Sequence, residues 1–218
     1  MRKAGIAFVC MGLLFLLGAA ALLLYNKQED AMAGKAAEEQ LSLLVDRIQV
    51  QKDQQTTTVP SDSVEATNAD EILLLPPTEN KEEEIMESIE VQGNGYIGYL
   101  SFPTLEMDLP VMSDWSVQKL YTAPCHYYGT AKGGNLVIMA HNYNHHFGRL
   151  TELRTGDPVY FVNIFGEAFF YEVVLQEILP SDCIPELTEG TYDLTLFTCT
   201  YGGANRITVR LNEAPPPQ

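Results

Sequence analysis

Residues 193–210 read Asp-Leu-Thr-Leu-Phe-Thr-Cys-Thr-Tyr-Gly-Gly-Ala-Asn-Arg-Ile-Thr-Val-Arg, and this segment carries the strongest local structural signal in the sequence. Leu194 to Thr198 is rich in β-branched and aromatic residues, and Ile207 to Leu211 alternates apolar and polar residues, so both segments are predicted to be strands. The loop Thr200 to Asn205 contains glycine and asparagine, which tolerate the backbone angles of a chain reversal. The stretch therefore predicts an antiparallel pair of strands joined by a tight loop.

Cys199 and Arg206 flank this loop and are expected to face each other across the antiparallel pair. Directly opposed Cβ atoms in such a pair lie roughly 4.5–5.5 Å apart. A guanidinium that keeps its charge would then favour the thiolate form of the cysteine. The alternative is that Cys199 is a small buried apolar residue and Arg206 a solvated one, as most residues of these types are.

A candidate proton-transfer group lies upstream, at His141. The apolar strand pattern Asn135-Leu-Val-Ile-Met-Ala140 precedes it, so His141 stands at a strand end, where binding residues usually project. An imidazole near Cys199 can exchange protons with a departing amine. A zinc site of His141, His145 and His146 would lack both the glutamate spacing of zinc proteases and a cysteine pair. We therefore expect no metal site.

Charge and cysteine content narrow the class of protein. The 218 residues carry a formal net charge of −16, and the acidity is concentrated in residues 26–90. Without clustered Lys and Arg, nucleic acid is not an expected partner. Outside the apolar N-terminal run the cysteines are Cys125, Cys183 and Cys199, an odd number that suggests a free thiol in an exported domain. Cys125 and Cys183 are expected either to form a disulfide or to be two buried thiols.

The N-terminus predicts a membrane anchor. The run Ala4 to Tyr25 contains no charged residue and is long enough to cross a bilayer as a helix, which needs about 20 residues. The apolar core of a cleaved signal peptide is usually shorter, about 7–15 residues. Basic residues precede the run and acidic residues follow it, so the positive-inside bias places the N-terminus in the cytoplasm and the remainder of the chain outside.

We therefore assign residues 1–26 to a single-pass transmembrane signal anchor in the cell membrane. A cleaved signal peptide is the alternative, because Ala31-Met-Ala33 has the small residues of a cleavage site.

Residues 27–90 are predicted to form an acidic stalk that is partly helical and then disordered. Within Glu38–Gln51, apolar residues recur with the i, i+3, i+4, i+7 spacing of a helix, at Leu41, Leu44, Val45 and Ile48. From Lys52 to about Glu90 too little apolar surface remains to offset chain entropy. The apolar segment Leu73-Leu-Leu-Pro-Pro77 is expected to be plain linker, with a strap or a lid within 60–90 as the alternative.

Residues 91–212 are predicted to form one mostly β domain with a few short helices, followed by a disordered tail at 213–218. Turn signals recur between short apolar stretches, and about 120 residues is a usual domain size. The expected strands are Tyr96–Phe102, Met107–Met112, Asn135–Ala140, Val159–Ile164, Ala168–Ile178, Leu194–Thr198 and Ile207–Leu211. Trp115–Tyr121 and Phe147–Leu153 are expected to be helical turns, and Gly166 the tip of a hairpin.

These features together resemble the sortases, membrane-anchored cysteine transpeptidases of Gram-positive bacteria. The resemblance rests on His141 after an apolar strand, on Thr195-Leu-Phe-Thr-Cys199 and on Arg206 opening the next strand. Further similar segments are Tyr96-Ile-Gly-Tyr-Leu100, Leu109-Pro-Val111, Gly134-Asn135, Phe147-Gly-Arg-Leu150 and Leu153 to Asp157. The resemblance covers about residues 91–212 and implies an eight-stranded β-barrel with the active site at one rim.

The resemblance also implies roles for individual residues. Cys199 would be the nucleophile, and His141 the general acid and then the general base. Arg206 would orient the substrate peptide and stabilise the oxyanion, and Thr198 would help to bind the substrate and the oxyanion. Arg210 is the alternative for this role. We prefer Arg206 because Arg206 lies nearer the strand end that carries Cys199. No cofactor is implied, and calcium dependence stays open.

The implied reaction is acyl transfer, with hydrolysis as a side activity. An LPXTG-like sorting signal of a surface protein would be cleaved, and an amine of peptidoglycan or a pilin lysine would accept the acyl group. Pilin-polymerising members usually carry an Asp-Pro-aromatic lid motif before the barrel and often a second membrane span. Neither is found in this sequence, so we expect anchoring of proteins to the cell wall.

Three other functions are compatible with parts of this pattern. They are a pilin-polymerising sortase, an inactive membrane-tethered binding domain of the same fold, and a cysteine transpeptidase that acts on the peptidoglycan peptide. The last is disfavoured because its Ser-x-Gly-Cys pattern is missing.

Overall fold

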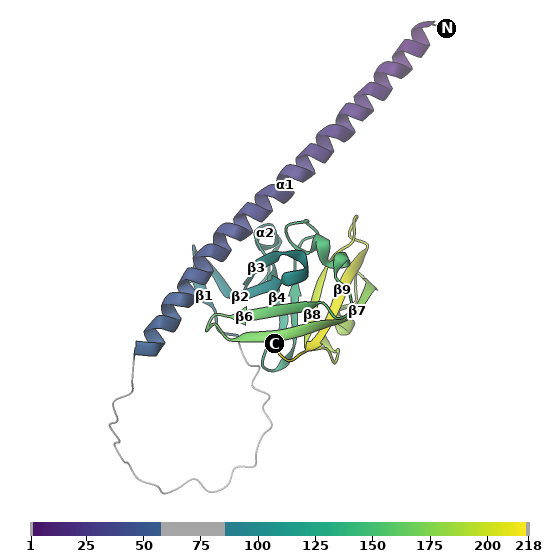
Figure 1. Ribbon diagram of the computed structural model, residues 1–218. Coiled ribbons are helices and arrows are strands. Elements are labelled where there is room, and N and C mark those ends of the chain that lie inside the picture. Colours follow the sequence, from purple (N-terminus) through teal and green to yellow (C-terminus); the bar gives the residue numbers. More distant parts are fainter. Residues whose placement is uncertain (1, 58–85, 217–218) are drawn as a thin grey trace, which may run out of the picture.

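The computed structural model describes residues 2–57 and 86–216, which form one long helix and a mostly β domain (Figure 1). The helix, α1, spans Arg2–Thr57 without a break. The possible lid or strap around Leu73–Pro77 lies outside the described residues, as do the last two residues of the predicted disordered tail.

The described strands form a closed barrel. Nine strands make one sheet in the order β1-β2-β3-β4-β5-β8-β9-β7-β6, and a further pairing of β2 with β6 closes eight of them into a ring. β1 pairs with β2 outside this ring. The strands are β1 (Ile89–Val91), β2 (Asn94–Phe102), β3 (Met107–Met112), β4 (Cys125–Thr130), β5 (Gly134–Met139), β6 (Pro158–Asn163), β7 (Ala168–Pro180), β8 (Leu194–Cys199) and β9 (Asn205–Glu213). The predicted eight-stranded barrel is confirmed, with β1 as an additional short strand.

The short helices lie in the connections between strands. They are η1 (Pro103–Leu105), α2 (Val117–Leu120), η2 (Phe147–Glu152) and α3 (Ile184–Thr188). The sequence predicts α2 and η2 and misses the other two. It also misses β4, because the pairing of β4 with β5 shifts register on both sides of Tyr128 and so removes the period-two alternation that signals a strand.

The barrel interior is a continuous hydrophobic core. Fully buried side chains from seven strands meet there, among them Leu100, Val111, Leu136, Ile138, Val159, Phe161, Val173, Leu196 and Val209. Burial of a large apolar side chain contributes about 1.5–3 kcal/mol. This core holds in place the strands that lead to Cys199 and His141.

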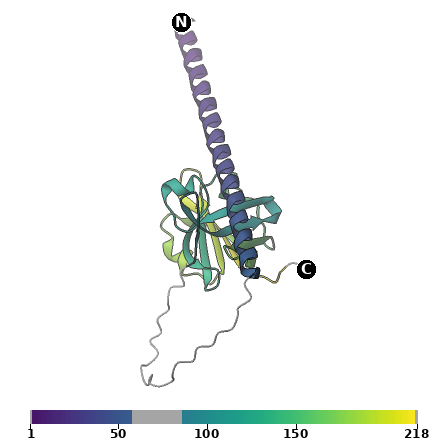
Figure 2. The ribbon, with the colours of Figure 1, turned by 90° about the vertical axis from the view of Figure 1, so that its left-hand side faces the viewer.

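Helix α1 packs along one side of the barrel and extends well beyond it on the side where α2 lies (Figures 1 and 2). Its buried residues repeat with helical spacing, at Ala33, Ala37, Gln40, Leu44 and Ile48. Leu44 joins a core cluster with Tyr96 and Met112. Gln40 donates a hydrogen bond to Gln92 (2.7 Å) and accepts one from the Tyr96 hydroxyl (3.2 Å).

Within the described residues α1 is the one helix that is long and apolar enough to cross a membrane by length and composition. The apolar N-terminal run and the docked segment belong to the same unbroken helix. The segment predicted as the start of a stalk is therefore an extension of the apolar N-terminal helix, and it packs on the barrel.

Candidate active site

The hairpin β8–β9 brings Cys199 and Arg206 to the end of the barrel. Their Cα atoms are paired across the two antiparallel strands, which confirms the predicted register. The loop closes tightly because Gly202 and Gly203 adopt left-handed backbone angles (φ 84° and 76°) that favour glycine. The Thr200 N–H donates to the Asn205 carbonyl at 3.0 Å. Cys199 is partly exposed at the strand end.

Parallel pairing of β5 with β8 brings His141 to the same end. Met139 is paired with Phe197, and the Ala140 N–H donates to the Phe197 carbonyl at 3.2 Å. His141 and Cys199 therefore leave two adjacent parallel strands at the same edge, and neighbouring strands lie about 4.8 Å apart. The predicted nucleophile and the predicted general base emerge side by side.

Thr198 links the two strand ends. Its side chain is buried, and its hydroxyl donates a hydrogen bond to the Ala140 carbonyl at 2.8 Å. A threonine hydroxyl has one proton to donate. In this arrangement that proton is used to hold β8 against β5, directly before Cys199 and His141.

The His141 imidazole is half-buried and packs against two tyrosine rings that the sequence analysis missed. The ring centroids of Tyr121 and Tyr143 lie 4.8 and 5.2 Å from that of His141. Burial lowers the pKa of His141, and the negative charge of Glu29 acts in the opposite direction. Its Nε2 is buried without a hydrogen-bond partner among the described residues. A neutral imidazole can accept a proton on the ring nitrogen that carries none.

The two arginines of β9 lie in different environments. The Arg206 Nη1 donates to the carbonyls of Gly203 (3.0 Å) and Asn205 (3.2 Å), so its guanidinium rests on the β8–β9 loop. Arg210 is 2% exposed and pairs with Glu177 at 2.8 Å. Its other donors reach the Thr195 hydroxyl and the Glu186 carbonyl. Arg210 has its hydrogen bonds inside the fold, which leaves Arg206 as the arginine beside the cysteine.

The remaining cysteines are two buried thiols. Cys125 and Cys183 are not bonded to each other, which settles the two alternatives left by the sequence. Burial raises the pKa of Cys125 to about 12 and also raises the pKa of Cys183. Since the thiolate is the reactive form, these two thiols are poor nucleophiles.

The histidines after His141 do not gather into a cluster. The Nδ1 of His145 lies 3.1 Å from the Asp30 carboxylate of α1, whereas His146 is fully buried. In the described parts of the chain, no group of three or more His, Cys, Asp or Glu side chains is arranged to hold a metal ion.

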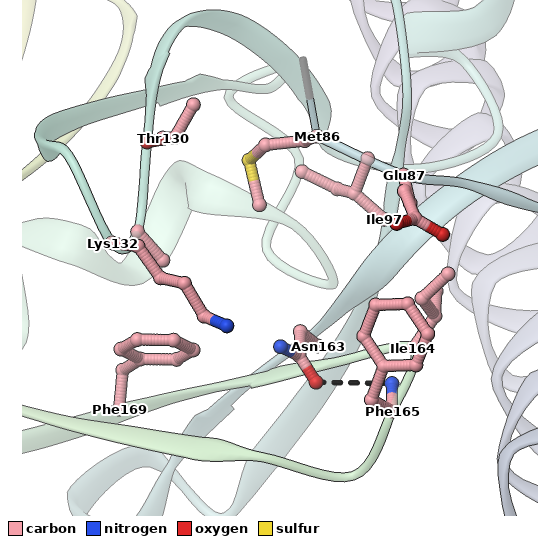
Figure 3. A pocket seen from close by; sticks show the side chains of 10 residues that line it. Met86, Glu87, Ile97, Thr130, Lys132, Asn163, Ile164, Phe165 and Phe169 are labelled. Atoms are coloured by element: carbon pink, nitrogen blue, oxygen red, sulfur yellow. Dashed lines mark hydrogen bonds between the residues drawn. The ribbon is translucent and has the colours of Figure 1, made fainter. Parts of the chain in front are cut away.

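A small cavity lies at the other end of the barrel (Figure 3). It has a volume of about 110 Å³ and is lined by the β4–β5 turn at Thr130 and Lys132, by Asn163 and Phe165 after β6, and by Met86. Asn163 accepts a hydrogen bond from the Phe165 N–H at 3.0 Å across its floor. None of the four predicted site residues lines it.

Comparison with known proteins agrees with this geometry. The sortase domain family matches residues 100–214, more than half of the chain. The chain is similar to the solved structure of sortaseC1 from Streptococcus suis, with 30% identity over 56% of this chain and 74% of that chain and a TM-score of 0.50. The chain is also similar to the Pilus Island 1 sortase C2 of Group B Streptococcus. The identity is 25% over 58% of this chain and 77% of that chain, with a TM-score of 0.50.

Sortase C from Clostridium perfringens SM101 shares the fold over 82% of this chain and 91% of that chain, at 22% identity and a TM-score of 0.51. A search of the curated proteins finds none that matches this sequence.

The closed barrel carries a cysteine and a histidine at the ends of two adjacent strands, as the sequence resemblance implied. The chain belongs to the sortase family, a family of cysteine transpeptidases. The resemblance found in the sequence is therefore confirmed.

Proposed function

We propose that this protein is a cysteine transpeptidase that cleaves an LPXTG-like sorting signal of surface proteins and transfers the acyl group to an amine of the cell wall. The observation that supports the proposal is that Cys199 and Arg206 are paired across β8 and β9, and that His141 follows β5, the strand beside β8, at the same end of the barrel. The apolar part of α1 anchors the protein in the membrane, with the N-terminus in the cytoplasm and the barrel outside.

The first half-reaction forms a thioester. The Nε2 of His141 takes the proton of the Cys199 thiol, and the sulfur attacks the carbonyl carbon of the scissile peptide bond. The Arg206 guanidinium turns from its loop carbonyls toward the substrate and stabilises the negative charge on the carbonyl oxygen. His141 then gives its proton to the leaving nitrogen, the C–N bond breaks, and the acyl group stays on sulfur.

The second half-reaction releases the product. An amine attacks the thioester carbon while His141 takes a proton from its nitrogen, a new C–N bond forms, and the C–S bond breaks. The proton returns to the Cys199 sulfur, so the enzyme is regenerated. Water in place of the amine gives hydrolysis. The thioester conserves the free energy of the cleaved amide, so no nucleotide is consumed.

Mass spectrometry of the full chain in detergent micelles tests the proposal. After incubation with a library of sorting peptides we expect an acyl adduct on Cys199, which an added glycine-type amine removes as a ligated product. The variant Cys199→Ala keeps the fold and forms neither adduct nor product. Peptide cleavage by Cys199→Ala would overturn the mechanism. An unmodified Cys199 with every peptide would instead support a binding domain of the same fold.

Pilin polymerisation is the second candidate function. It is favoured by the similarity to proteins named sortase C, one of them from a pilus island. A competition assay separates the two functions, with a glycine-type amine and a pilin lysine offered to the same acylated enzyme. Transfer to the glycine-type amine supports anchoring to the cell wall, and transfer to the pilin alone replaces it by polymerisation.

A further inference from the structure

One carboxylate of α1 holds the loop that carries His141. The loop spans residues 141–146, between β5 and η2. Asp30 accepts a hydrogen bond from the backbone N–H of His145 at 3.1 Å, and the same oxygen lies 3.1 Å from the His145 Nδ1. Its second oxygen accepts from the Asn144 side-chain amide at 3.3 Å. Two consecutive loop residues are thus bound by one side chain from the other end of the chain.

The contact is partly buried and charged. The Asp30 side chain is 14% exposed. Burial alone would raise the pKa of Asp30, but the hydrogen bonds from His145 and Asn144 outweigh it and lower this pKa below its ordinary value. Asp30 is therefore ionised at neutral pH, and hydrogen bonds to an ionised acceptor are roughly twice as strong as neutral ones.

Small residues let the helix approach the loop closely. A Cβ atom at Gly34 would lie 2.6 Å from Cγ of His145, a separation that real Cβ atoms do not show. The neighbouring Ala33 is buried in the same contact. His146 is fully buried, close to the backbone of Ala33, with its ring 5.6 Å from that of Tyr143. Helix and loop therefore pack with no space left between them.

Internal hydrogen bonds connect this contact to His141. The Tyr143 carbonyl accepts from the backbone N–H groups of His146 (2.9 Å) and Gly148 (2.8 Å), and the His141 carbonyl accepts from Phe147 (3.1 Å). The Tyr143 ring also packs against the His141 ring. These hydrogen bonds and the ring contact form a continuous connection from the loop at His145 to the His141 imidazole.

We propose that Asp30 is a positioning residue of the active site, through which the membrane-proximal part of α1 fixes the loop that carries His141. The proposal rests on the proposed function, because it assigns proton transfer to His141. Asp30 lies five residues after Tyr25, the end of the apolar run, or about 8 Å along the helix axis. The helix that enters the membrane thus also forms part of the catalytic end of the barrel.

Kinetics of three variants of the full chain in detergent micelles test this assignment. Asp30→Ala is expected to lower kcat for peptide transfer between about tenfold and 100-fold, because small displacements of a catalytic group cost this much, with KM within about twofold. Asp30→Asn keeps an oxygen that accepts from the His145 N–H, so its kcat lies between those of Asp30→Ala and the wild type. Asp46→Ala, an exposed aspartate of the same helix, is the matched control and leaves kcat unchanged.

Wild-type kcat in Asp30→Ala would overturn the assignment. A purely structural role would lower kcat only through a smaller folded fraction, with KM unchanged and with a lower thermal midpoint. A fall in kcat that is matched by the loss of folded protein at the assay temperature would therefore also count against positioning.

Histidine side-chain NMR provides a readout that needs no activity. The chain has four histidines, each assigned by its own substitution. In Asp30→Ala the signals of His141 and His145 are expected to move or broaden, whereas His126 stays unchanged because it lies on β4, bonded to the Gly129 carbonyl. Unmoved His141 and His145 signals would overturn the positioning role whatever the activity. If the signals move in Asp30→Ala but the wild-type chain transfers no peptide, the contact between Asp30 and the loop is confirmed and the proposed function is overturned.

Discussion

The cysteine side and the histidine side of the catalytic end are held in place in different ways. Cys199 and Arg206 belong to one hairpin, and strand register alone sets them opposite each other. His141 begins a loop that packs on α1 through contacts with Asp30 and Gly34. These two residues lie more than one hundred positions earlier in the chain. Local pairing fixes one half of the site, and a distant side-chain contact fixes the other half.

The difference predicts which half is easier to perturb. Backbone ladders in a closed barrel open only with the whole fold, whereas a side-chain contact at a surface opens at a much lower cost in free energy. The cysteine side is therefore expected to survive changes in α1 that displace the histidine side. The variants below separate the two halves, beginning with the largest expected effect.

Arg206 and Arg210 lie on the same strand and test the cysteine side. Arg206→Ala is expected to lower kcat about 100- to 1,000-fold, the loss seen when an oxyanion donor is removed, with little change in stability. Arg210→Ala leaves Glu177 without its ion pair and is expected to lower the free energy of unfolding by about 3 kcal/mol or more. Steady-state kinetics and urea unfolding of both variants measure the contrast.

Arg206→Lys is the control for charge, and we expect it to restore only part of kcat because an ammonium lacks the planar fork of donors. If Arg210→Ala loses its activity and keeps its stability, the two arginines exchange roles.

The cysteine side could be predicted from sequence because its determinants are contiguous. The apolar pattern on both sides of Gly202 and Gly203 fixes strands, loop and register together, and the structure confirms the pair of Cys199 with Arg206. His141 was found because it follows an uninterrupted apolar strand. That it emerges next to Cys199 depends on the parallel pairing of β5 with β8, which no local pattern encodes.

The histidine side could be predicted only in part. The periodicity of the stalk points to Leu41 and Val45, yet Val45 is 42% exposed. The buried stripe of α1 instead includes Ala33, Ala37 and Gln40, two small residues and a polar one that carry almost no hydrophobic signal. Asp30 is one acid among many in an acidic region. Its partner is set by tertiary packing, so no spacing in the sequence distinguishes it.

His146 makes the histidine side sensitive to acid. Burial lowers the pKa of His146 to about 4, with a further contribution from His141, so the folded state binds this proton less well than the unfolded chain does. The contribution of His146 to the free energy of unfolding is then fully present above pH 6.5. It is lost, by about 3 kcal/mol, as the pH falls from 6.5 toward 4. Urea unfolding of the wild type and of His146→Gln over this range measures the loss.

The variant His146→Gln is expected to flatten the acid limb, and His126→Gln on β4 is the control that keeps it. The groups that face His146 are His141, Asp30 and the backbone of Ala33 and Thr122, and they are unchanged in both variants. An equally steep acid limb in His146→Gln would show that other groups produce the loss.

Thr198 joins the two halves and tests their connection. Thr198→Val keeps the shape of the side chain and leaves the buried Ala140 carbonyl without the hydroxyl donor. We expect a loss of about 1–3 kcal/mol in the free energy of unfolding and a lower kcat, because the tie between the strand ends is lost. Thr198→Ser retains the hydroxyl and serves as the control. Wild-type stability with reduced kcat in Thr198→Val would instead favour a direct contact of Thr198 with the substrate.

Gly34→Ala sets two physical effects against each other and gives the smallest expected change. Alanine favours a helix over glycine by about 1 kcal/mol, so propensity alone predicts a more stable α1. The added Cβ would however lie 2.6 Å from Cγ and 2.8 Å from Cβ of His145, atoms too near the backbone to move away freely. We therefore expect the loop to shift and kcat to fall about threefold, since small misplacements of a catalytic group lower the rate.

Gly18→Ala is the matched control, because a Cβ at Gly18 of the same helix meets no atom within 4 Å. It adds a methyl group to the same helix without a new contact and should leave kcat unchanged. If Gly34→Ala also leaves kcat unchanged, α1 moves to accommodate the new methyl group and the loop does not move. The position of the loop would then not depend on α1. If kcat falls in Gly34→Ala alone, the helix is the rigid partner, and the histidine side depends on a part of the chain that the cysteine side does not need.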